Sequence, residues 1–222
     1  MAGLAVLISG GLDSAILLGD ALRRGEHVAP LFVRFGLLWE QVELLYLNKY
    51  LKALSGPRLD PLTILDQPVA DIYRDHWSLT GRNVPAADTP DEAVFLPGRN
   101  VLLLAKALLW CHMHHVPAVA LGALSTNPFP DATPEFFRGL EQTINGAVGG
   151  AVRIVLPFAM LTKREVMRLG QDLPLQFTFS CIQPIAGLHC GRCNKCAERR
   201  HAFADAGMID PTRYASSGLS PA

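Results

Sequence analysis

The chain of 222 residues suits one domain with a small appendage, and a 50% share of hydrophobic residues allows it to bury a sizeable core. Lys plus Arg and Asp plus Glu both number 20, and this zero net charge argues against a protein that binds duplex nucleic acid. No hydrophobic run reaches the roughly 18 residues of a membrane span. Residues 1–3 lack the charged start of a secretory signal, so we expect a cytoplasmic protein without a membrane partner.

Short apolar segments alternate with helical patterns along most of the chain. In order, they predict a strand at residues 4–8, a helix at 14–24, a strand at 27–35, a helix at 38–54, a strand at 62–65, a helix at 99–115, a strand at 117–121, a helix at 134–148 and a strand at 152–156. A capping box at residues 162–165 opens a short helix, and a last helix lies near residues 197–206. This alternation predicts a mostly parallel sheet with helices on both faces, a doubly wound α/β fold.

Two stretches do not follow this alternation. Residues 66–97 are rich in proline and polar residues and show no hydrophobic period, which is typical of a lid or a substrate loop. His76 and Trp77 within this stretch are candidates to cover a base. Residues 214–222 are mostly small, so we expect them to fray.

A glycine-containing turn links the first strand to the first helix, and it reads Ser9-Gly10-Gly11-Leu12-Asp13-Ser14. Ligands of open α/β sheets bind at the carboxyl ends of strands, where glycines allow close approach and a helix N-terminus favours an anion. Asp13 adds negative charge, which suits a role in orienting the turn or in holding Mg²⁺. The turn lacks the Walker lysine and the third glycine of the dinucleotide fingerprint. The alternative is an ordinary turn in which Ser14 is the N-cap.

The pattern Ser-Gly-Gly-Xaa-Asp-Ser after a first strand resembles the pyrophosphate loop of the N-type ATP pyrophosphatases. The resemblance implies an adenine nucleotide alpha hydrolase-like sheet and an enzyme that forms an adenylate and releases pyrophosphate. It also implies that ATP and Mg²⁺ bind at the turn, through Ile8, Ser9, Gly10, Gly11, Leu12, Asp13 and Ser14. The turn alone does not distinguish GMP synthetase, argininosuccinate synthetase, tRNA thiolases and 7-cyano-7-deazaguanine synthase.

Four of the five cysteines, Cys181, Cys190, Cys193 and Cys196, are spaced C-x8-C-x2-C-x2-C. In a reducing compartment, such clustering indicates a metal rather than disulfides. Two-residue gaps let successive sulfurs face one centre, and four thiolates form a closed tetrahedral Zn²⁺ site with no open position for catalysis. An iron–sulfur cluster or four unligated thiols are the alternatives. Cys111 lies in a helical apolar pattern and is predicted to belong to the core.

The cysteine segment closely resembles the C-terminal zinc segment of the 7-cyano-7-deazaguanine synthase family. Other stretches match that family in order and spacing, from residue 6 to about residue 201: Pro97-Gly98-Arg99-Asn100, Phe129-Pro130-Asp131, Leu161-Thr162-Lys163 and Ser180-Cys181. The resemblance implies a nucleotide-binding α/β domain at residues 1–175 and a zinc-binding segment at residues 176–222 that packs on it. It also implies a homodimer.

In that family, ATP activates the carboxylate of 7-carboxy-7-deazaguanine, ammonia gives the amide, and a second activation dehydrates the amide to the nitrile. The resemblance implies that Asp13, Arg99 and Lys163 are catalytic, with Arg99 on the nucleotide because its planar fork suits phosphate. It implies that Asp131 and Thr126 bind the substrate, Asp131 by accepting hydrogen bonds from a guanine-like N–H edge. The alternatives are a solvated lysine at Lys163 and a turn residue at Asp131. Such chemistry needs no nucleophilic side chain, which argues against a tRNA thiolase.

Two stretches depart from the family. Phe35-Gly36-Leu37-Leu38-Trp39-Glu40 stands where the family has Tyr-Gly-Gln-Arg-His, and Leu124-Ser125-Thr126-Asn127 stands where it has Glu-Thr-Asp. The first change is either core repacking or a changed reaction. We therefore keep a second hypothesis, a paralogue that passes the activated carboxylate to another amine on a small molecule or a protein, which residues 37–39 would dock if exposed. A third hypothesis is a nucleotide-binding zinc module without catalysis, against which the complete glycine turn argues.

Overall fold

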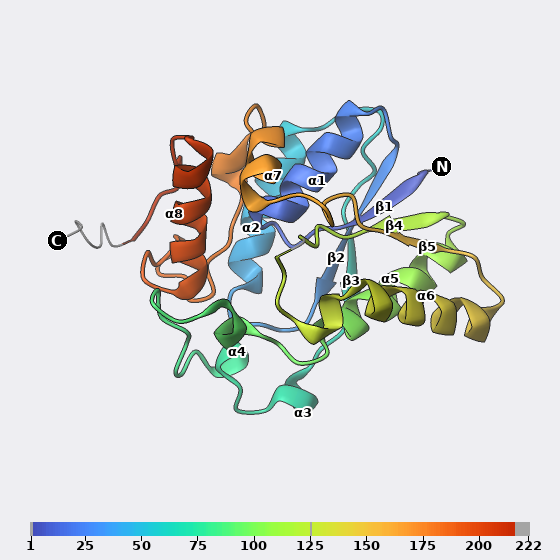
Figure 1. Cartoon of the computed structure of the whole chain (residues 1–222), viewed down its shortest axis with the longest axis horizontal. Helices are drawn as coiled ribbons and strands as arrows, with labels where there is room; N and C mark the ends of the chain where they lie inside the picture. The colour runs from blue at the N-terminus through green and yellow to red at the C-terminus, as the bar shows by residue number, and fades with distance from the viewer. Residues whose placement is uncertain (1, 125, 216–222) are drawn as a thin grey trace.

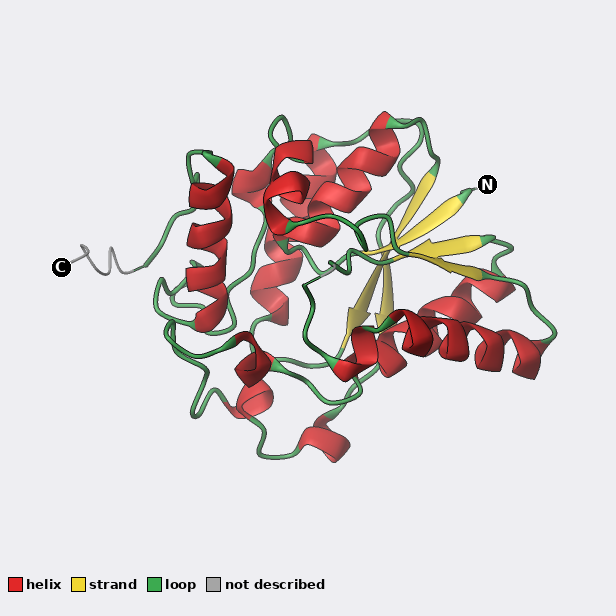
Figure 2. Ribbon diagram, in the orientation of Figure 1, coloured by secondary structure: helices red, strands yellow, loops and turns green. Residues whose placement is uncertain are grey.

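The computed structural model describes residues 2–124 and 126–215, which contain a sheet of five parallel strands. The strands are β1 (Leu4–Leu7), β2 (Val28–Arg34), β3 (Thr63–Asp66), β4 (Ala118–Ala120) and β5 (Arg153–Val155). They are arranged in the order β3-β2-β1-β4-β5, and each neighbouring pair is parallel. Figures 1 and 2 show the sheet between two layers of helices, which confirms the doubly wound α/β fold predicted from the sequence.

The helices cover both faces of the sheet. They are α1 (Leu12–Arg23), α2 (Glu40–Ala53), α3 (Ala70–Tyr73), α4 (Trp77–Thr80), α5 (Arg99–Met113), α6 (Pro134–Val148), α7 (Lys163–Leu169) and α8 (Asn194–Ala206). In Figure 1, α1, α2 and α7 lie on one side of the sheet and α5 and α6 on the other, while α8 contacts α7. Within β1, Val6 shares a buried cluster with Ile16 of α1, and Leu7 shares one with Leu104 of α5. The two faces of β1 therefore serve two separate cores.

The sheet changes its winding direction next to β1. The chain passes from β1 to β2 and β3 on one side, whereas β4 on the other side of β1 is followed by β5. In open α/β sheets, connections that diverge in this way leave a crevice at the carboxyl ends of the strands, where ligands bind. The turn that follows β1 starts at Ile8 and therefore lies at this crevice.

Some sequence predictions need correction. Residues 66–97 are less irregular than expected, because α3 and α4 lie within them. The last helix starts at Asn194, earlier than predicted. Fraying from Tyr214 is wrong for that residue, since its hydroxyl donates to Asp210 and the Arg200 guanidinium lies 4.1 Å from its ring centre. The remainder of that tail, residues 216–222, is outside the described residues. Within the described ranges, no helix is long and apolar enough to cross a membrane.

Close packing of α7 on α1 leads to a stability prediction. A Cβ atom on Gly170, just after α7, would lie 2.5 Å from Cγ1 of Ile16, which is fully buried. We expect Gly170→Ala to lower the free energy of unfolding by about 1–3 kcal/mol through overpacking. Gly146→Ala on α6 is the matched control, because its Cβ would meet no atom within 4 Å and should raise stability by up to about 1 kcal/mol. Urea unfolding of both variants measures the difference, and equal stabilities would contradict this packing.

Candidate active site

A cavity of about 330 Å³ opens at the carboxyl ends of the central strands. Its walls come from the turn after β1, from the segment that follows β4, and from α2, α5 and the start of α8. Lys163, at the start of α7, also lines it. The cavity therefore lies where the divergence of the sheet connections predicts a ligand site.

Hydrogen bonds between Ser9 and Ser14 link the two ends of the glycine turn. The Ser14 hydroxyl lies 3.3 Å from the Ser9 hydroxyl and 3.2 Å from the Ser9 backbone nitrogen, which donates to it. Gly10 has a φ of +84°, a left-handed conformation that favours glycine. The N-cap of α1 is Gly11, and no side chain caps the helix, so the interpretation of Ser14 as the N-cap is wrong. The first N–H groups of α1 thus stay available to an anion.

The two apolar residues of the predicted nucleotide loop contribute differently. Ile8 and Leu12 are both buried in the core on the α1 side of the sheet. Their side chains hold the loop in place, and only their backbone atoms can face a ligand. The side chains of Ser9, Asp13 and Ser14 are the polar groups of the loop that line the cavity.

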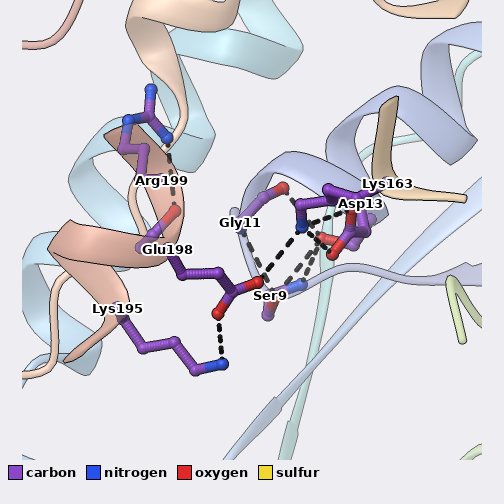
Figure 3. A network of polar contacts seen from close by, with 9 residues as sticks. Ser9, Gly11, Asp13, Lys163, Lys195, Glu198 and Arg199 are labelled. Carbon is purple, nitrogen blue, oxygen red and sulfur yellow. Dashed lines mark hydrogen bonds and ion pairs between the residues drawn. The ribbon is translucent and has the colours of Figure 1, made fainter. Parts of the chain in front are cut away.

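Asp13 and Lys163, predicted from separate motifs, form an ion pair across the cavity (Figure 3). The Lys163 ammonium lies 2.9 Å and 2.8 Å from the two carboxylate oxygens of Asp13, and 3.3 Å from Glu198. Lys195 forms a second ion pair with Glu198. Lys163 is thus not a solvated lysine, and the four side chains form one alternating chain of charges.

The neighbouring charges shift the pKa values of Lys163 and Glu198. Burial opposes the charge on Lys163, but Asp13 and Glu198 outweigh it and raise the pKa of Lys163 above its ordinary value. Burial likewise opposes ionisation of Glu198, yet Lys195 and Lys163 lower its pKa to about 2. Lys163 and Glu198 are therefore both charged at neutral pH.

Arg99 and Asp131 lie at the first turn of α5. Arg99 lines the cavity, and its buried Nε has no hydrogen-bond partner among the described residues. The Asp131 carboxylate accepts from the Asn100 backbone N–H at 3.0 Å, and the Asp131 carbonyl oxygen accepts from the Asn100 side-chain amide at 2.9 Å. Asp131 thus caps the start of α5, although it also lines the cavity. Thr126 is exposed to solvent, and the next residue, Asn127, lines the cavity.

Most of the segment at residues 35–40, which departs from the family pattern after β2, is buried in the protein. Leu37 and Trp39 are each 6% exposed, whereas Leu38 is 45% exposed. The buried Glu40 carboxylate accepts hydrogen bonds from the backbone N–H groups of Phe35 and Gly36, both at 2.6 Å. Repacking is confirmed for Leu37 and Trp39. The three residues therefore do not form the exposed apolar surface that would have suited docking of a partner.

The proline-rich segment at residues 66–97 contributes Trp77, Val94, Phe95 and Leu96 to the cavity wall. Trp77 lines the cavity and stacks on Trp39, with ring centres 5.7 Å apart and planes 18° from parallel. His76 instead begins α4, where its ring nitrogen accepts from the Ser78 N–H at 3.3 Å. The second departing stretch is less fully defined, because Ser125 lies outside the described residues.

Sequence reasoning missed four charged residues of the cavity wall: Glu43, Lys195, Glu198 and Arg199. Lys195 and Glu198 lie within two residues of Cys196, and charged side chains beside a predicted metal ligand were a usable signal. Arg199 is buried and donates hydrogen bonds to Ser180, Thr212 and the Leu175 carbonyl. It therefore ties α8 to the segment that carries the first of the four cysteines.

Glu43 of α2 is held in an unusual state. Its side chain is half-buried and lines the cavity, and loss of solvent around the carboxyl raises its pKa to about 8. The charge of Arg99 and a hydrogen bond from Trp39 offset only part of this effect. The raised pKa favours the protonated form of Glu43 near neutral pH.

This raised pKa predicts a pH-dependent stability. A carboxyl with a pKa of about 8 when folded and 4.5 when unfolded stabilises the protein fully below pH 4.5. That contribution falls as the pH rises toward 8. A glutamine side chain cannot ionise, so Glu43→Gln should remove this loss of stability. Relative to the unsubstituted protein, the free energy of unfolding of the variant should be about 3 kcal/mol higher at pH 8 than at pH 4.5, after allowance for partial exposure. Denaturant curves at several pH values test this, with exposed Glu92→Gln as control; parallel profiles for Glu43→Gln and the unsubstituted protein would contradict it.

The four clustered cysteines are brought together as the spacing predicts. Their Sγ atoms lie within 4.8 Å of one another and are buried. Cys181 and Cys193 sulfurs are 3.9 Å apart, as are those of Cys190 and Cys196. A Zn²⁺ ion with Zn–S bonds of about 2.3 Å requires tetrahedral edges of about 3.8 Å, so the geometry fits one ion. Cys111 is buried in the core apart from this group, as predicted.

Comparison with known proteins decides the family. The model of the family described as "Queuosine biosynthesis protein QueC" matches residues 4–207. The chain belongs to this family. Curated relatives named 7-cyano-7-deazaguanine synthase occur in Solidesulfovibrio magneticus, at 34% identity over 96% of this chain and 95% of that protein, and in Methylococcus capsulatus, at 32% over 95% and 98%. A third, from Anaeromyxobacter dehalogenans, is 31% identical over 95% and 94%.

A solved structure shares the fold. It is described as a 4-thiouridine synthetase–RNA complex with bound ATP, and it matches with a TM-score of 0.50 at 14% identity. The match covers 92% of this chain and 50% of that one, so this chain spans half the length of that structural relative. The likeness supports the α/β architecture alone.

Proposed function

We propose that this protein is an ATP-dependent carbon–nitrogen ligase of the 7-cyano-7-deazaguanine synthase type. It converts 7-carboxy-7-deazaguanine and ammonia, through the amide, into 7-cyano-7-deazaguanine and releases AMP and pyrophosphate. The observation that carries the proposal is the family match over residues 4–207, together with relatives of that name that align with nearly the whole chain.

The glycine turn supports binding of the ATP phosphates. The uncapped N-terminus of α1 favours an anion, and the Ser9 and Ser14 hydroxyls lie beside it. Lys163 and Arg99 bring positive charge to the same cavity, where pyrophosphate develops negative charge as it leaves. Mg²⁺, which Asp13 would help to hold, supplies charge that neutralises the triphosphate.

The reaction needs two rounds of activation. A carboxylate oxygen of the substrate attacks the α-phosphorus of ATP and the bond to pyrophosphate breaks. Ammonia then attacks the acyl carbon and loses a proton, and AMP leaves with that oxygen. In the second round the amide oxygen attacks another ATP, and AMP leaves with it while the nitrogen gives up two protons to form the nitrile. No side chain becomes covalently bound, so the residues of the chain act by positioning and charge.

We also propose that residues 176–222 are a zinc-bound segment of the same unit as residues 1–175. Zn²⁺ held by the four cysteines would fix the start of α8, and α8 carries Lys195 and Glu198 to the cavity. Because four thiolates close the coordination sphere, this ion is structural. A homodimer and a cytoplasmic location stay predictions that rest on the family resemblance.

The two other hypotheses receive no support from the site. An exposed apolar surface at residues 37–39 would have suited docking of a protein acceptor, but Leu37 and Trp39 are buried. A non-catalytic module has no need for the ion pair between Lys163 and Asp13 in a cavity of substrate size. Both remain as outcomes of the experiment below.

Product analysis tests the proposal. Purified protein with MgATP, 7-carboxy-7-deazaguanine and ammonium is analysed by mass spectrometry. The proposal predicts the nitrile together with AMP and pyrophosphate. AMP formed only after addition of another amine would support the paralogue instead, and no AMP under any condition would support a module without catalysis.

A further inference from the structure

The carboxyl groups that line the cavity differ in the number of hydrogen bonds and ion pairs that they make. Among the described residues, those that line it are Asp13, Glu40, Glu43, Asp131 and Glu198. Lysines pair with Asp13 and Glu198, and backbone N–H groups occupy both oxygens of Glu40. Asn100 engages Asp131 through three contacts. Glu43, in the described part of the chain, has the Trp39 hydrogen bond and no ion pair.

Glu43 lies between the glycine turn and an aromatic wall. Its backbone oxygen would be 3.6 Å from a Cβ on Gly10, which places this part of α2 against the turn. Trp39 and Trp77, stacked on each other, line the same cavity. A flat apolar wall beside a polar group with free hydrogen-bonding capacity is suited to a planar heterocycle.

Arg99 faces this region from α5. Its charge acts on Glu43, yet the two side chains do not form an ion pair, and the buried Nε of Arg99 has no partner among the described residues. A buried arginine nitrogen without a partner and a cavity-lining carboxyl without an ion pair, both among the described residues, indicate groups kept for a ligand. The unfavourable protonation state of Glu43 supports the same conclusion, because a ligand N–H edge would favour its ionised form.

We propose that Glu43 binds the N–H edge of the deazaguanine ring and thereby selects for the 2-amino group. The inference rests on the proposed function and names the residue that recognises its substrate. An ionised carboxylate accepts two parallel hydrogen bonds, one from the ring N–H and one from the 2-amino group. Asp131, the residue that the family resemblance implies for this role, instead caps α5.

The test uses one substrate analogue and two variants. Calorimetry measures binding of 7-carboxy-7-deazaguanine and of its analogue without the 2-amino group, 7-carboxy-7-deazahypoxanthine. The unsubstituted protein should prefer the 2-amino compound by about 10- to 100-fold, the value of a good bidentate contact. Glu43→Gln should reduce this preference to about threefold or less, because an amide offers a single acceptor oxygen. Asp131→Asn should keep the preference.

Several outcomes separate this inference from the proposed function. Thermal unfolding of Glu43→Gln should show one cooperative transition, which shows that the variant is folded. If Glu43→Gln keeps the preference, or if Asp131→Asn is the variant that loses it, the inference is wrong while the proposed function stands. If the unsubstituted protein forms nitrile but shows no preference for the 2-amino group, the inference again fails alone. If it binds ATP but neither deazapurine, both proposals fail.

Discussion

Cys193→Ser is expected to release the bound metal and to unfold the C-terminal part of the protein. The four sulfurs are buried within 4.8 Å of one another, so one ion can hold all four and link the segments that carry them. Structural zinc in small domains is bound with an apparent free energy of about 10–16 kcal/mol, which exceeds the stability of most domains. Loss of one ligand should therefore remove one equivalent of zinc and abolish cooperative unfolding of α8.

Metal analysis and thermal unfolding measure this effect. Cys111→Ser is the matched control, because Cys111 is equally buried but lies outside the metal group. It should keep one equivalent of zinc and lower stability by only about 1–3 kcal/mol, the penalty of a buried unsatisfied hydroxyl. Full zinc content in Cys193→Ser, or less than half an equivalent in the unsubstituted protein, would contradict the site. Iron with sulfide would show that the alternative cluster is the correct one.

Lys163→Met is expected to lower the rate of AMP formation by about 100- to 1,000-fold, in line with the removal of one preorganised charge at a reaction centre. Lys163 is the cation shared by Asp13 and Glu198. Without it, two carboxylates face the cavity where the triphosphate must bind. The loss should appear in single-turnover AMP formation as well as in the affinity for ATP.

The neighbouring Arg164→Met is the control, because Arg164 is exposed on the same first turn of α7. It should react within about twofold of the unsubstituted protein, as surface substitutions usually do. The Asp13→Asn and Lys163→Met effects should not add, since the two side chains are in direct contact. Additive effects, or a Lys163→Met protein with normal rates, would show that this ion pair has no part in catalysis.

Local sequence signals predicted much of the fold. Buried parallel strands such as β1 read as short apolar runs, and the Thr162 capping box starts α7 as its pattern indicated. The cysteine spacing likewise predicted the metal group, because the two-residue gaps constrain where successive sulfurs lie. In each case the decisive interactions join residues close in sequence.

The ion pairs and ring contacts of the cavity join residues that are distant in sequence, and the sequence did not predict them in detail. Lys163 and Asp13 are 150 positions apart, and the motif around each gave no reason to pair them. The stacking of Trp39 on Trp77 depends on how residues 66–97 fold back, a segment without hydrophobic period. No motif marks Glu43, and only the position of α2 against the turn makes it part of the site.

The transfer of substrate oxygen to AMP tests the adenylation account most directly. 7-Carboxy-7-deazaguanine labelled with ¹⁸O in both carboxylate positions is converted with MgATP and ammonium, and AMP is analysed by mass spectrometry. The account predicts two AMP molecules per nitrile, each with one ¹⁸O, because each activation passes one substrate oxygen to the α-phosphorus. Unlabelled AMP, or label in inorganic phosphate alongside ADP, would contradict it.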